Sequence, residues 1–182
     1  MKRNFIITTL LMIVAATLSS ALTTYFGTDT KRIITVGKSE FFGVKGHSFS
    51  VNTTCRPTES FPVDLTLKSD SSIPMYVWLR IEMPIFAGEG IYTFENNADW
   101  TLQEKGLTAD NKYSYVYRYI EPLEAEETTS PLTDKFTMRD MSKKEYGTYS
   151  NLAFTVQPFC SGTDGNTDPD AGWQAVKGEY NL

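Results

Sequence analysis

The sequence is poor in the residue types that most catalytic and metal sites need. Its 182 residues include one histidine, His47, and two cysteines, Cys55 and Cys160. A zinc protease of the His-Glu-x-x-His type needs two histidines on one helix, so that chemistry is excluded. The chain also lacks a Gly-x-Ser-x-Gly elbow, a phosphate-binding loop and a dinucleotide glycine pattern. We expect no enzyme activity and place His47 at the surface or a strand end. A secreted hydrolase with a Ser-His-Asp triad is the least favoured alternative.

Basic residues are also scarce. Seventeen Lys and Arg stand against 22 Asp and Glu, which gives a formal net charge of -5. A chain this acidic is repelled by phosphate backbones and anionic lipids. We therefore expect no nucleic-acid partner, and membrane contact only through the N-terminal segment.

Only one long apolar run is present, at the N-terminus. Residues 1–24 read MKRNFIITTLLMIVAATLSSALTT, with Lys2 and Arg3 first, then apolar residues, then small ones. This is the order of a secretory signal peptide, and we expect cleavage between Thr24 and Tyr25. The usual Ala-x-Ala is missing, and no charge appears between Arg3 and Asp29. Because that stretch is long enough to span a bilayer, an uncleaved anchor is the alternative. Either way the sequence predicts export to the exterior or surface of a bacterial cell, with signal peptidase as a transient partner.

Residues 25–182 are expected to form a single, mainly β domain. Apolar and polar residues alternate in 61–69, 74–84, 112–120 and 151–160, the pattern of half-buried strands. Shorter strands are expected at 31–37, 39–44, 47–53 and 134–140. Asp168, Pro169 and Gly178 supply the cap, first residue and end of a helix. The predicted fold is an antiparallel, jelly-roll-like β-sandwich with one or two short helices.

The two cysteines form no metal motif. In an oxidising exterior Cys55 and Cys160 could pair, and the closed loop would contribute about 4–5 kcal/mol in the chain-entropy model. The alternative is two separate buried thiols, which behave as small apolar side chains.

Two groups of residues are candidates for binding a partner. Tyr113, Tyr115, Tyr117 and Tyr119 share one face of a strand, which covers a core or else contacts carbohydrate or protein. The acidic cluster that follows is expected to be a solvated loop, with a partner contact as the alternative. Its members are Glu121, Glu124, Glu126 and Glu127.

An acidic loop near the C-terminus resembles the start of a calcium loop. Oxygen ligands stand at alternate positions, namely Asp164, Asn166, Asp168 and Asp170. Pro169 occupies the place of the required glycine, and Ala175 the place of the bidentate glutamate. We therefore expect no cofactor and a solvated turn with a helix cap, and weak calcium binding is the alternative.

Four stretches, in order, resemble one known family. They are ATLSSALTTYFGTDTKRIITVG, SSIPMYVWLRI, YSYVYRYIEPLEAEETTSPL and FTVQPFCSGTDGNTDPDAGWQAV. Each is similar to a segment of the TasA and camelysin family, biofilm matrix proteins exported through the signal peptidase SipW. The resemblance implies a jelly-roll domain, export and, in the best-known members, assembly into extracellular fibres. Thr24 departs from the family's usual alanine, and the metalloprotease label attached to camelysin finds no support in these residues.

These observations favour an extracellular structural subunit. Once the signal is removed, residues 25–37 become a free N-terminal strand, and Ile33, Ile34 and Val36 could complete a sheet in the next copy. Head-to-tail contacts of this kind do not close, so they make filaments. The expected partners are further copies or related secreted subunits. The alternative is a monomeric surface module that binds glycan or protein through the tyrosine face.

Overall fold

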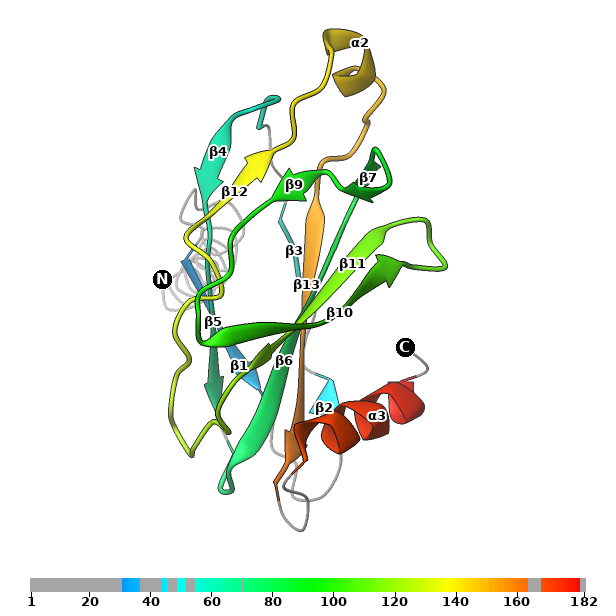
Figure 1. Ribbon diagram of the computed structural model, residues 1–182. Helices are drawn as coiled ribbons and strands as arrows, with labels where there is room; N and C mark the ends of the chain where they lie inside the picture. The colour runs from blue at the N-terminus through cyan, green and yellow to red at the C-terminus, as the bar shows by residue number, and fades with distance from the viewer. Residues whose placement is uncertain are drawn as a thin grey trace, which may run out of the picture. The chain divides into compact units, whose positions relative to one another are not determined.

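The computed structural model describes residues 31–36, 44–45, 49–51, 55–69, 71–163 and 168–180 (Figure 1). These residues belong to the second of two units in the chain, Lys31–Leu182. The cleavage point at Thr24 and Tyr25, His47, Asp164 and Asn166 lie outside the described residues, so their predictions stay predictions.

The larger layer is an antiparallel sheet. Its strands run in the order β10 (Trp100–Leu107), β11 (Tyr113–Tyr119), β6 (Met75–Met83), β13 (Phe154–Gly162) and β2 (Val44–Lys45). The short strand β3 (Phe49–Val51) also pairs with β13. Inner residues of β6 alternate as predicted, since Met75, Val77, Leu79, Ile81 and Met83 are all fully buried.

The facing layer is built from shorter pieces. One sheet has the order β4 (Ser60–Pro62), β12 (Lys135–Met138) and β9 (Tyr92–Thr93), and a hairpin joins β7 (Ile85–Phe86) to β8 (Glu89–Gly90). A two-stranded sheet pairs β5 (Asp64–Ser69) with β1 (Lys31–Val36). The prediction of a mainly β, antiparallel, sandwich-like fold is confirmed, and the parallel β1–β5 pair is its exception.

A cluster of aromatic rings fills the space between the layers. Phe94 and Phe136 stack with ring centroids 4.6 Å apart, and Phe136 meets Phe154 at 4.9 Å. Phe61 and Tyr92 complete the contacts, with Phe61 edge-on to Tyr92 at 5.4 Å. Each fully buried aromatic or aliphatic side chain contributes about 1.5–3 kcal/mol by leaving water.

A proline such as Pro158 usually marks an edge or a bend of a strand, because it lacks the backbone N–H. Instead β13 continues to Gly162 and has neighbours on both sides. Pro158 pairs with Leu79 on one side. On the other side it falls between the residues that pair with β3 and those that pair with β2, so neither strand needs its missing N–H.

The predicted C-terminal helix is present as α3 (Pro169–Tyr180), and it runs two residues beyond Gly178. The Asp168 carboxylate accepts a hydrogen bond of 3.0 Å from the Asp170 backbone N–H, as expected of a cap. A one-turn helix, α2 (Lys143–Tyr146), begins with a capping box between Ser142 and Glu145. No helix in the described part of the chain is both long and apolar enough to cross a membrane.

α3 covers part of the outer face of the larger sheet. Its buried residues Gly172, Trp173 and Val176 face the strands. They close a second, smaller core on that face, formed with Tyr76, Trp78, Val116 and Phe159. α3 therefore covers only part of the outer face of β6, the strand predicted at 74–84, and the rest of that face is open.

Candidate functional site

The predicted assembly strand lies at the edge of a sheet. β1 pairs with β5 in parallel along six residues, from Lys31 beside Asp64 to Val36 beside Ser69 (Figure 1). Ile33 and Ile34 stand in register with Thr66 and Leu67. Among the strand pairs of the described residues, β1 takes part in this one alone. We call the side of β5 that β1 occupies the assembly edge.

The opposite side of β5 is already occupied by residues 127–134. The Ser69 N–H donates to the Glu127 carbonyl at 2.9 Å, and the Thr129 N–H donates to the Leu67 carbonyl at 2.8 Å. The Leu132 N–H donates to the Leu65 carbonyl at 2.9 Å. β5 is thus an interior strand whose Leu65 and Leu67 are buried, and its assembly edge needs a partner strand.

The acidic cluster adjoins the segment 127–134 that pairs with β5. The Glu126 carboxylate pairs with the Lys68 ammonium at 2.6 Å, and the Glu124 N–H donates to the Glu127 carboxylate at 2.8 Å. The hydrogen bond and charge of Lys68 lower the pKa of Glu126. Because both partners are exposed, the pair contributes little to stability. Sequence reasoning took this segment for a solvated connection and missed its backbone pairing with β5.

The tyrosine face is directed at the core. Tyr113 and Tyr117 are 8% and 6% exposed, and the half-buried Tyr115 and Tyr119 pack against the main core. Burial also raises the pKa of Tyr117 to about 12. This burial supports the core-covering interpretation, and a contact of the tyrosine face with carbohydrate or protein stays a prediction.

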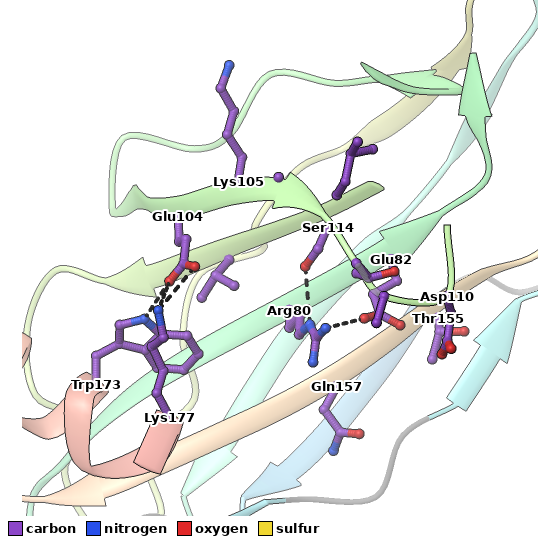
Figure 2. A pocket seen from close by; sticks show the side chains of 15 residues that line it. Arg80, Glu82, Glu104, Lys105, Asp110, Ser114, Thr155, Gln157, Trp173 and Lys177 are labelled. Atoms are coloured by element: carbon purple, nitrogen blue, oxygen red, sulfur yellow. Dashed lines mark hydrogen bonds and ion pairs between the residues drawn. The ribbon is translucent and has the colours of Figure 1, made fainter. Parts of the chain in front are cut away.

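The open part of the outer face forms a polar hollow that we call the outer groove (Figure 2). Its cavity is about 480 Å³. Strands β6, β11 and β13 form its floor, α3 one wall, and the β10–β11 connection another. Its charged and polar lining includes Arg80, Glu82, Glu104, Ser114, Gln157 and Lys177.

Two side-chain groups fix the geometry of the outer groove. The Arg80 Nε donates to Ser114 Oγ at 3.1 Å, and the Arg80 guanidinium forms an ion pair with Glu82. Glu104 points toward α3, where its carboxylate accepts from Trp173 Nε1 at 3.1 Å and from Lys177 Nζ at 2.9 Å (Figure 2). Burial alone would raise the pKa of Glu104, but these two donors hold it below its ordinary value.

A β-bulge in β10 brings Glu104 into the outer groove. The register against β11 shifts between Leu102, beside Tyr117, and Glu104, beside Val116. The extra residue, Gln103, donates from its amide to Asp170 of α3 at 2.9 Å. The hydrogen bond at the bulge therefore joins α3 to β10, the edge strand of the larger sheet. No sequence pattern in residues 100–107 predicts the bulge.

The two cysteines are both buried in the main core. The Cys55 thiol donates to the Glu59 carbonyl at 3.0 Å, and its backbone carbonyl accepts from Tyr146 of α2. Cys160 lies on β13, in register with Val77 of β6 and Val44 of β2. The disulfide between Cys55 and Cys160 stays a prediction.

Two of the four residues predicted for calcium, Asp168 and Asp170, belong to the described part of the chain. The Asp168 carboxylate caps α3, and the Asp170 carboxylate accepts a hydrogen bond from the Gln103 amide. Both side chains therefore have contacts within the protein. Within the described ranges, no group of three or more His, Cys, Asp or Glu side chains is placed to hold a metal ion. Since Asp164 and Asn166 are outside those ranges, the calcium alternative is not tested.

Comparisons of the chain with protein-family models, with curated proteins and with solved structures find no match.

Proposed function

We propose that this protein is an exported structural subunit, or an accessory subunit, of extracellular fibres of a bacterial surface or biofilm matrix. Copies assemble by adding the N-terminal strand of one to the assembly edge of the next. The observation that carries the proposal is the six-residue parallel pairing of β1 with β5 at a sheet edge. The strand begins shortly after a segment with the composition of a signal peptide.

A ladder of backbone hydrogen bonds can be formed equally well within one chain or between two. The β1 of a second copy has the same sequence and register, so it offers β5 the same ladder and the same side chains. One assembly edge accepts one strand, so a copy whose edge is filled by a neighbour has its own β1 free. That strand can fill the edge of another copy, and the chain of contacts grows without closing.

Several sequence properties agree with this role. The chain has few residues suited to catalysis, an acidic balance and an apolar N-terminal segment. The resemblance to the TasA and camelysin family adds export and fibre formation as expectations. The proposed partners are further copies or related secreted subunits, with signal peptidase acting during export.

The test compares two forms of the protein by negative-stain microscopy and size-exclusion chromatography. Protein beginning at Tyr25 should form filaments, and protein beginning at Lys38 should stay monomeric. Because the shorter form has an uncovered β5, a synthetic peptide of residues 25–37 should bind to it and raise its melting temperature. Undiminished filaments from the shorter form, or no response to the peptide, would refute the mechanism.

A further inference from the structure

We propose that the outer groove binds a neutral oligosaccharide chain. The groove shares no residue with the β1–β5 pair, so this inference stands apart from strand exchange. α3 covers one part of the outer face and leaves Arg80, Glu82, Ser114 and Gln157 to line an open cavity. A volume of about 480 Å³ lies within the usual range for small-ligand sites, about 300–1,000 Å³.

The charges that line the groove are balanced. Three cationic side chains, Arg80, Lys105 and Lys177, stand with three acidic ones, Glu82, Glu104 and Asp110. The whole chain carries a net charge of -5, so this balance is local to the groove. A strongly anionic or cationic ligand would meet as much repulsion as attraction there. An uncharged ligand rich in hydrogen-bonding groups meets no such penalty.

The hydrogen-bonding groups are already held in place. The Arg80 guanidinium is oriented by Ser114 and Glu82, and Glu104 is oriented by Trp173 and Lys177. A guanidinium has five N–H donors and a carboxylate about four acceptor positions, so both keep capacity for a ligand. Groups fixed before binding lose little conformational entropy when the ligand arrives.

The floor of the groove favours a sugar over a peptide. β11, β6 and β13 each have paired neighbours on both sides, so the floor offers no row of unpaired backbone groups for a peptide strand. Recognition must come from side chains that both donate and accept, which suits hydroxyl groups. Leu107, which is 67% exposed, and Val116 also line the groove, and they can cover the C–H faces of a sugar ring.

A second cavity lies beside the outer groove. Thr155 lines the outer groove and also a second cavity of about 350 Å³, where Tyr149 and Asn151 lie. The two cavities are therefore neighbours along β13, and a ligand longer than the outer groove would reach the second cavity.

The test is calorimetric titration of the exported protein with a panel of defined hexamers. The neutral probes are cellohexaose and isomaltohexaose, the charged probes are oligogalacturonate and chitosan hexamers, and a Ser/Gln-rich hexapeptide is the peptide probe. At least one neutral sugar should bind more tightly than every other probe. Preference for a charged hexamer or for the peptide would overturn the proposal, as would no binding by either neutral sugar.

Three variants locate the binding. Arg80→Met should weaken it at least tenfold, and Arg56→Met, which changes an exposed arginine elsewhere, should not affect it. Gly106→Trp should also block the groove without disturbing the fold, because a Cβ at Gly106 meets nothing within 4 Å. Unaltered binding in Gly106→Trp, with an unaltered melting temperature, would overturn the assignment to this groove. Filaments from Gly106→Trp should be normal, which separates this result from the test of strand exchange.

Discussion

The two glycines of α3 allow a matched test of how the helix sits on the sheet. In a helix interior, replacing glycine by alanine stabilises by up to about 1 kcal/mol, because glycine loses more backbone freedom on folding. A Cβ at Gly178 would meet nothing within 4 Å, so Gly178→Ala should gain about 0.5–1 kcal/mol.

Gly172 is in a different position on the same helix. Its Cβ would lie 3.2 Å from Cη2 of Trp78 and 3.4 Å from Oγ of Ser161. Trp78 is fully buried, so the ring cannot swing away and the helix itself must shift. Overpacking of this kind costs about 1–3 kcal/mol, which outweighs the gain in helix propensity. Gly172→Ala should therefore be neutral or destabilising by up to about 2 kcal/mol.

The assay is urea unfolding followed by circular dichroism and tryptophan fluorescence, with thermal melting as a check. For a domain of this size, 1 kcal/mol corresponds to about 2–4 °C in melting temperature. Gly178→Ala should melt higher than the parent protein, and Gly172→Ala at the same temperature or lower. Equal stabilisation by both substitutions would show that α3 does not pack on Trp78 through Gly172.

Three further predictions concern titration and thiols. Burial raises the pKa of Tyr117 to about 12, from an ordinary value near 10. The contribution of the neutral Tyr117 side chain to the free energy of unfolding is therefore fully present below pH 10 and is lost as pH rises toward 12. Tyr117→Phe should remove up to about 3 kcal/mol of that alkaline loss of stability, and identical alkaline unfolding curves would contradict this. Since the pKa of Glu104 is lowered, its contribution is present above the unfolded pKa and is lost as pH falls. Glu104→Gln should therefore loosen α3 at neutral pH, by no more than about 1 kcal/mol because the site is partly exposed. Tryptophan emission should shift to longer wavelength, and an unchanged spectrum and stability would count against the contact. Thiol counting on the unfolded protein, purified without reductant, should find no reactive thiol, because Cys55 and Cys160 are expected to pair in an oxidising exterior. Two reactive thiols would contradict the disulfide.

Local patterns predicted much of the fold. The alternation in 74–84 identified the inner residues of β6, because side chains of a strand point to opposite faces with a period of two. The cap at Asp168 and the proline after it located the start of α3 for the same local reason. These features depend only on neighbouring residues, and one sequence is enough to recognise them.

Features that depend on distant partners were not accessible in this way. Alternation showed that Tyr113 and Tyr117 share a face, but only the opposite layer decides that this face is covered. The pairing of 127–134 with β5 uses backbone groups, which leave no trace in polar side chains. The bulge before Glu104 depends on the register against β11, so the sequence could not place that carboxylate in the outer groove.

The most direct test of strand exchange mixes two variants that each carry one introduced cysteine, with Cys55 and Cys160 replaced by alanine. Thr35 of β1 is in register with Lys68 of β5. When Thr35→Cys protein is mixed with Lys68→Cys protein, both beginning at Tyr25, a disulfide between these positions can form only across two chains. The control replaces the second variant with Thr101→Cys, which has its cysteine on the exposed side of β10.

The account predicts that mild oxidation yields a cross-linked dimer of the two variants, and that the Thr101 control yields none. Filaments without that cross-link would show that the copies meet through some other surface. Monomers without cross-link at any concentration would contradict strand exchange altogether.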